Sequence, residues 1–167
     1  MTSLAKARAL ALIVPLALLG GAYGFQYVWG HLWPCEMCWW QRYAHFAALP
    51  FALAAVLLAS RLKDGGRALV WLAALAILVS GAIGFWHAGI ELKLLPGFTQ
   101  CTSTLTGSPE EMLKAVFDRP MVRCDDVQWS WLGISMAGWN AIISLLSAFA
   151  ILWLSLRKPK TAALGTA

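Results

Sequence analysis

Residues 33–42 read Trp33-Pro34-Cys35-Glu36-Met37-Cys38-Trp39-Trp40-Gln41-Arg42 and separate one apolar run of the chain from the next. The two cysteines have the Cys-x-x-Cys spacing, at which a turn that opens a helix can bring both sulfurs within bonding distance. Thiolates at the start of a helix are stabilised by the helix dipole and by nearby cations. Arg42 is such a cation, one helical turn after Cys38. The stretch therefore predicts a dithiol at a membrane surface.

The same Cys-x-x-Cys spacing serves redox chemistry, structural zinc and haem attachment. Haem attachment requires a histidine directly after the second cysteine, and Trp39 stands there instead. Zinc requires two further ligands of matching spacing. The other cysteines, Cys101 and Cys124, lie far apart in the sequence and form no second pair of this kind. Redox chemistry is favoured over simple apolar packing of the cysteines, and we expect no metal.

The composition is that of an integral membrane protein. Of the 167 residues, 60% are hydrophobic and 13% are charged, against roughly 25% charged in an ordinary soluble domain. The apolar residues fall into four blocks that lack a polar stripe, each close to the ~20 residues that a spanning helix needs. We expect one all-α domain over residues 1–167, a four-helix transmembrane bundle with spans at about 9–29, 43–59, 68–90 and 131–156.

The distribution of charge predicts the orientation of these spans. The segments before the first block, between the second and third, and after the fourth carry eight cations and one acid, whereas the other two loops carry five cations and seven acids. By the positive-inside rule, both termini and the 61–67 link are cytoplasmic, and the loops at about 30–42 and 91–130 are periplasmic in a bacterium. All the cysteines then lie where disulfides persist. Because the cations are spread over separate segments, we expect no nucleic-acid partner for the net charge of +5.

The first block could instead be a cleaved signal peptide, since Lys6 and Arg8 precede it. Its apolar run continues to Trp29, which is longer than the core of a signal peptide, and no clear Ala-x-Ala cleavage site ends it. We therefore expect a membrane span.

The long second loop carries Cys101 and Cys124 on either side of an expected short helix. Ser108-Pro109-Glu110-Glu111 has the pattern of an N-cap, a first-turn proline and a capping glutamate, and predicts a helix to about Asp118. We expect its apolar face to rest on the membrane interface, although a partner protein could use it instead. A disulfide between the two cysteines, acting only as a brace, contributes about 3 kcal/mol.

Two ionisable residues in the outer parts of the spans have alternative roles. Arg42 could simply extend to the lipid headgroups, but its closeness to Cys38 favours a functional role. His87 is the only ionisable residue near the outer end of the third span, at about the depth of Cys38. It could be a hydrogen-bonded histidine of the bundle or could contact the polar head of a cofactor.

Two cysteine pairs on the oxidising face of a four-span bundle, the first beside an arginine, resemble the disulfide bond formation protein B (DsbB) family. The first and last motifs are individually specific, and their combination with this topology is very specific. The residues that carry the resemblance are Pro34-Cys35-Glu36-Met37-Cys38 with Gln41-Arg42, Trp86-His87 with Gly89 and Glu91, Cys101, and Cys124 followed by Gln128-Trp129-Ser130-Trp131-Leu132-Gly133.

The resemblance implies an enzyme of the bacterial inner membrane that reoxidises a periplasmic thioredoxin-like thiol oxidase, DsbA, and passes the electrons to ubiquinone or menaquinone. Cys101, paired with Cys124, would be attacked by the thiolate of the partner. Cys124 would then exchange with Cys35, leaving Cys38 as the thiolate that donates to quinone. Arg42 would stabilise that thiolate and the developing quinone anion, and His87 would line the quinone site.

Physical chemistry supports this function independently of the family resemblance. Electrons that pass from a soluble protein to a lipid-soluble acceptor by thiol exchange need one mobile and one fixed thiol pair. A structural membrane protein with bracing disulfides is the alternative from another class. A paralogue that serves a dedicated partner is the alternative among enzymes.

Overall fold

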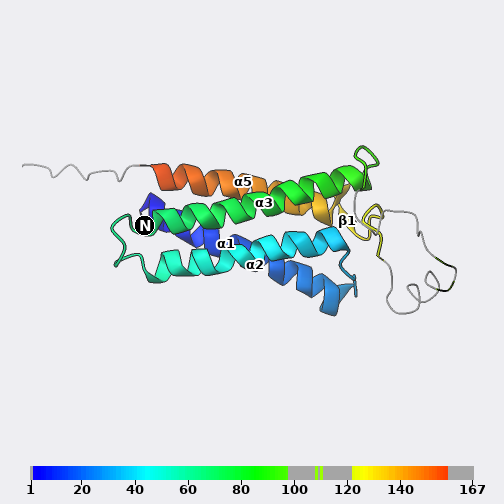
Figure 1. The fold of residues 1–167 in the computed structure, drawn as a ribbon, viewed down its shortest axis with the longest axis horizontal. Helices are drawn as coiled ribbons and strands as arrows, with labels where there is room; N and C mark the ends of the chain where they lie inside the picture. The colour runs from blue at the N-terminus through cyan, green and yellow to red at the C-terminus, as the bar shows by residue number, and fades with distance from the viewer. Residues whose placement is uncertain (1, 98–107, 109, 111–121, 158–167) are drawn as a thin grey trace, which may run out of the picture.

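The computed structural model describes residues 2–97, 108, 110 and 122–157. Four long helices lie side by side, and each packs against two or more of the others (Figure 1). The N-terminus and the α2–α3 turn lie at one end of the bundle, and the strand β1 lies at the other (Figure 1). The elements in chain order are α1 (Ser3–Gly24), the π-helix η1 (Phe25–Trp29), α2 (Glu36–Leu57), α3 (Arg67–Glu91), β1 (Ser130–Trp131), β2 (Ile134–Ser135) and α5 (Met136–Leu156).

The helices differ in how well they suit a membrane. Among the described residues, three helical segments are long and apolar enough to cross one, namely Ser3–Trp29, Arg67–Glu91 and Met136–Leu156. The fourth long helix, α2, has 22 residues but buries Gln41 and Arg42 near its start. The protein is therefore mostly helical, with three candidate spans beside a fourth helix. The crossing of the membrane by α2 stays a prediction.

Capping residues explain where the helices begin. α1 begins before the expected 9–29 range, because the Thr2 hydroxyl accepts a hydrogen bond from the Ala5 amide at 3.2 Å. α2 begins before the expected 43–59 range, because the Cys35 sulfur caps it by accepting from the Cys38 amide at 3.3 Å.

The last helix begins at Met136, later than the expected start of 131, because residues 130–135 form a hairpin. Its strands pair antiparallel, and the turn residues Leu132 and Gly133 have φ of 53° and 76°. Two positive φ values are typical of the tight turn that matches strand twist. The expected helix at 108–118 and the predicted site residue Cys101 lie outside the described residues, apart from Ser108 and Glu110.

Small residues let the helices approach closely. At the end of the bundle that holds the N-terminus, a buried cluster contains alanines from every long helix: Ala7, Ala11, Ala48, Ala52, Ala55, Ala73, Ala74 and Ala148. Nearer the other end, a methyl group added to Gly84 of α3 would lie only 3.0 Å from the carbonyl oxygen of Ala137 on α5. Large apolar side chains such as Phe149, which is 76% exposed, cover the outside.

Candidate functional site

The dithiol is built into the start of α2. Cys35 is the N-cap and Cys38 is in the first turn, which places their sulfurs 3.0 Å apart. The Cys35 thiol donates to the Cys38 sulfur, and the Cys38 amide donates back to the Cys35 sulfur. Cys35 is buried, and Cys38 is partly exposed. Cys38 is therefore the member of the pair that a bound molecule can reach more easily.

His87 of α3 lies beside the dithiol. Its Nε2 is 3.7 Å from the Cys35 sulfur and 3.2 Å from the backbone carbonyl of Cys124. Its Nδ1 faces the side-chain amide of Gln41 at 3.0 Å. The Glu91 carboxylate, one turn further along α3, approaches Nε2 to 3.7 Å. The histidine is 3% exposed, so its ring is held by these groups rather than by solvent.

Cys124 packs directly onto this group, in a buried cluster with Cys35, Met37 and Ile90. The pKa of the Cys35 thiol is raised, first by its hydrogen bond with the Cys124 thiol, then by Cys38 and by burial. Cys35 is therefore protonated at neutral pH in this arrangement. The geometry brings a sulfur of the second loop within reach of the first pair.

Ion pairs hold the segment that carries Cys124. Lys93, just after α3, lies 2.8 Å from the Asp125 carboxylate and also donates to the Asp125 carbonyl at 2.9 Å. Arg123 donates two hydrogen bonds to the same carboxylate. These contacts, Arg123 first and then Lys93, hold the pKa of the Asp125 carboxyl well below its usual range. We call Lys93, Arg123 and Asp125 the loop clamp.

Arg42 is a buried cation that lies next to Cys38 on α2. It is 6% exposed. Its guanidinium donates to the side chain of Gln26 and to the carbonyl of Ala22, and it lies 4.7 Å from the ring centre of Tyr23. No acidic side chain among the described residues forms an ion pair with it. Its charge is therefore held in place by neutral groups and is available to an anion.

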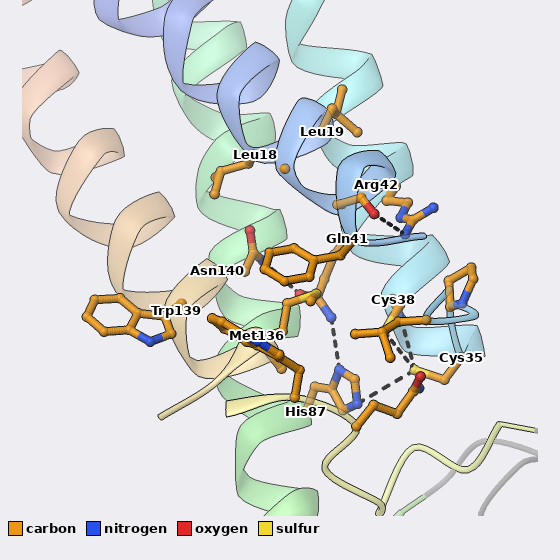
Figure 2. A pocket seen from close by; sticks show the side chains of 18 of the residues that line it. Leu18, Leu19, Cys35, Cys38, Gln41, Arg42, His87, Met136, Trp139 and Asn140 are labelled. Atoms are coloured by element: carbon orange, nitrogen blue, oxygen red, sulfur yellow. Dashed lines mark hydrogen bonds between the residues drawn. The ribbon is translucent and has the colours of Figure 1, made fainter. Parts of the chain in front are cut away.

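These groups open onto a cavity of about 400 Å³, a typical size for a small-molecule site. Figure 2 shows the polar lining residues Cys38, Gln41, His87 and Asn140. Most of the remaining wall is apolar or aromatic and comes from α1, η1 and α5, including Leu18, Leu19, Ala22, Phe25, Met136, Trp139 and Ile143. The arrangement can hold a flat apolar molecule with a polar group near the Cys38 sulfur and the Arg42 guanidinium.

The ligand atoms of Cys35, Cys38 and His87 lie within 4.8 Å of one another, which is close enough for a metal ion. However, Nε2 of His87 faces the carbonyl of Cys124, which can only accept a hydrogen bond. That nitrogen therefore carries a proton rather than a free lone pair. The hydrogen bonds favour thiol chemistry over metal binding here.

The residues predicted from the sequence meet at this place, except Cys101, which lies outside the described residues. Cys35, Cys38 and Arg42 come from the start of α2, His87 comes from α3, and Cys124 comes from the segment before β1.

Sequence reasoning gave no role to Gln26, Gln41 or Asn140, which are all polar groups of the site. Asn140 could have been found, because a polar amide inside an apolar span is expected to hydrogen-bond to a neighbouring helix. Gln41 was recognised only as part of a motif.

The sequence of the chain is similar to those of known proteins. A family model described as "Disulfide bond formation protein DsbB" matches residues 5–154. A relative named disulfide bond formation protein B from Aromatoleum aromaticum is 30% identical over 155 residues, which cover 85% of this chain and 89% of that protein. A relative of the same name from Hahella chejuensis is 32% identical over 164 residues, covering 86% and 88% of the two chains. No solved structure matches the chain.

Proposed function

Because the chain belongs to the disulfide bond formation protein B family, we propose that it is a thiol:quinone oxidoreductase. It reoxidises a periplasmic thiol oxidase of the DsbA type and passes the electrons to ubiquinone or menaquinone. The observation that carries the proposal is the meeting of Cys38 and Arg42, a buried cation without an acidic partner among the described residues, at an apolar cavity. A site of this kind suits an acceptor that becomes negatively charged as it is reduced.

The cavity residues fit a quinone. The apolar walls from α1 and α5 would hold the ring and the start of its tail, and Arg42 would face a ring oxygen. When bound, the quinone supplies the two-electron acceptor that no side chain provides. Arg42 would stabilise negative charge on the Cys38 sulfur and on the bound quinone. Trp139 and Phe25 exclude water from the same space.

Electrons reach this place through sulfur exchange. The thiolate of the partner attacks Cys101 of a Cys101–Cys124 disulfide, and the bond between Cys101 and Cys124 breaks. The Cys124 thiolate that is released attacks Cys35 of the Cys35–Cys38 disulfide, which leaves Cys38 as a thiolate. The packing of Cys124 against Cys35 supports this second exchange. Each step forms one sulfur–sulfur bond and breaks one.

We further propose that all four long helices cross the bacterial inner membrane, with both termini in the cytoplasm and the cysteines in the periplasm. The cation-rich segments 1–8, 61–67 and 157–160 support this orientation. The periplasm is also the compartment where the disulfides of the cycle persist. A cysteine placed at Gly65 should react with a membrane-impermeant reagent only after spheroplasts are opened. Labelling in intact spheroplasts would invert the topology.

The test of the activity uses purified protein, a reduced thioredoxin-like donor and either ubiquinone-1 or a menaquinone analogue. Loss of quinone absorbance should match the donor thiols oxidised, one quinone for two thiols. The Cys38→Ser protein should show the background rate. If the wild-type cysteines stayed oxidised in the presence of excess donor and no quinone were consumed, the disulfides would be braces and the chain a structural membrane protein.

A further inference from the structure

A chain of buried side-chain amides lies behind His87, on the side away from the cysteines. The Gln41 side-chain nitrogen donates to the Met37 carbonyl at 3.1 Å and to Nδ1 of His87 at 3.0 Å. The Gln41 side-chain oxygen accepts from the Asn140 side-chain nitrogen at 2.8 Å. In Figure 2, Gln41 lies between Asn140 and His87. The amide chain therefore connects α5 to the histidine of α3 through α2.

Backbone carbonyls fix the direction of each amide. A carbonyl oxygen can only accept a hydrogen bond, so the Gln41 atom that faces Met37 must be nitrogen. The Asn140 nitrogen likewise faces the Ser80 carbonyl at 3.2 Å. Neither amide can turn over without placing two oxygens against each other. Nδ1 of His87 therefore accepts a hydrogen bond from the Gln41 amide and carries no proton.

The opposite side of the ring leads to the same assignment independently. Nε2 of His87 lies 3.2 Å from the Cys124 carbonyl, which requires a donor. His87 is therefore held as the neutral tautomer with its proton on Nε2. That N–H is 3.7 Å from the Cys35 sulfur, a distance that still allows a hydrogen bond to sulfur. The ring presents a donor, and not a base, to the dithiol.

We propose that Gln41 and Asn140 are positioning residues, which hold His87 as the Nε2–H tautomer so that it can stabilise negative charge on the Cys35 sulfur. The inference rests on the proposed thiol exchange. A thiolate other than those of Cys35 and Cys124, such as that of a small dithiol, can attack Cys124 of a Cys35–Cys124 disulfide. A new sulfur–sulfur bond then forms at Cys124. The old bond breaks, and its electron pair stays on Cys35. The N–H of His87 faces that pair, and no proton has to be transferred.

The first test is spectroscopic and needs no quinone. In full-length protein labelled with ¹⁵N-histidine, the His87 ring, assigned with His87→Gln, should show a protonated Nε2 and an unprotonated Nδ1 at neutral pH. Replacement Gln41→Glu keeps the shape but makes the group facing Nδ1 an acceptor. This variant should place a proton on Nδ1. A wild-type ring protonated on Nδ1, or a Gln41→Glu ring left bare at Nδ1, would overturn the proposal.

The second test measures the exchange step alone. A full-length chain in which Cys38 and Cys101 are serines leaves Cys35 and Cys124 as its only cysteines. Reduction of their disulfide by a small dithiol should slow about tenfold when Asn140→Leu is added, the effect of one lost hydrogen bond to a charged group. The change should move the His87 ¹⁵N signals as well.

Ser155→Ala is the matched control for this test. It removes a buried hydroxyl of α5 that accepts from Trp71 at 2.8 Å, far from the cysteines. Its reduction rate and histidine signals should equal those of the Cys35/Cys124 chain without a further substitution. Equal rates in Asn140→Leu and Ser155→Ala would overturn the positioning role. Because quinone is absent from both measurements, they separate this inference from the proposed quinone reduction.

Discussion

The two ends of the helix bundle are built from different residues. At the end with the N-terminus, the helices meet through buried alanines such as Ala48 and Ala52, and the packed side chains are apolar. At the cysteine end, the same four helices surround a cavity of about 400 Å³ and bury amides, a histidine and an arginine. Alanine packing fills the space between the helices at one end, whereas polar side chains and a cavity occupy it at the other.

The difference predicts that substitutions at the two ends act on different properties. At the alanine end they should change stability and leave the chemistry of the thiols unaltered. At the cysteine end they should change the chemistry of the thiols, in addition to the stability lost wherever a buried polar partner is left unpaired.

The largest expected effect comes from Cys124→Ser, which removes the sulfur that joins the second loop to Cys35. Turnover with the protein donor should fall to the background rate, since serine cannot form a disulfide. Quinone reduction driven by a small dithiol should continue through Cys35 and Cys38. The measurement is quinone consumption with each donor. Normal turnover of Cys124→Ser with the protein donor would disprove the relay.

Arg42→Gln should have the next largest effect, because it removes the only cation buried beside the cavity among the described residues. Loss of one preorganised charge contact in a poorly hydrated site costs a few kcal/mol, or about a hundredfold in rate. At saturating donor, turnover should fall and the apparent affinity for quinone should weaken. Arg42→Lys keeps the charge without the planar guanidinium, so its turnover should lie between those of the wild type and Arg42→Gln. Unchanged quinone dependence in Arg42→Gln would make Arg42 only a membrane anchor.

The alanine end can be tested with two neighbouring residues of α2. Ala48 is fully buried in the alanine cluster, whereas Ala47 is exposed. Ala48→Leu should destabilise the protein by about 1–3 kcal/mol through overpacking, and Ala47→Leu should change stability little. Thermal unfolding in detergent measures both. Below the unfolding temperature, Ala48→Leu should keep its rate of quinone reduction. A tenfold loss of rate in folded Ala48→Leu would show that the two ends are coupled.

Much of this division could be predicted from the sequence, because the signals are local. Four apolar blocks predicted the long helices, and the Cys-x-x-Cys pair followed by Arg42 predicted thiols beside a cation. The first residue of each helix could not be predicted as accurately from the sequence. Cys35 caps α2 with its sulfur, and the hairpin before α5 depends on the turn at Leu132 and Gly133. Neither has a hydropathy signal.

The polar network was harder to predict, because it depends on which helix faces which. Gln41 and Asn140 lie 99 residues apart in the sequence and meet at 2.8 Å. The sequence placed His87 at the depth of Cys38, but it could not say that Nε2 would lie 3.7 Å from Cys35. Hydropathy gives depth in the membrane, whereas rotation of each helix about its axis is decided by packing.

The smallest expected effect concerns the loop clamp, which keeps Cys124 at the cysteine end. Its ion pairs are largely exposed, with Arg123 and Lys93 side chains at 58% and 63%, so solvent screens them. In reduced protein, Asp125→Asn should speed labelling of Cys124 by a pyridyl disulfide about twofold, as for a screened ion pair. High salt should produce the same change in the wild type. Asp126→Asn, beside it but 67% exposed and 3.8 Å from Arg123, is the matched control and should have no effect.

The pH dependence of the clamp follows from the lowered pKa of the Asp125 carboxyl. A carboxyl whose pKa is lower in the folded state contributes stability above its unfolded pKa of about 4, and the contribution is lost as the pH falls further. Cys124 should therefore stay protected at neutral pH and become more accessible in acid, where pyridyl disulfides still react with thiols. Asp125→Asn should lack this acid-dependent change, because its amide does not titrate. If the wild type and Asp125→Asn responded to acid equally, Cys124 would be held by its apolar contacts with Met37 and Ile90 and not by the clamp.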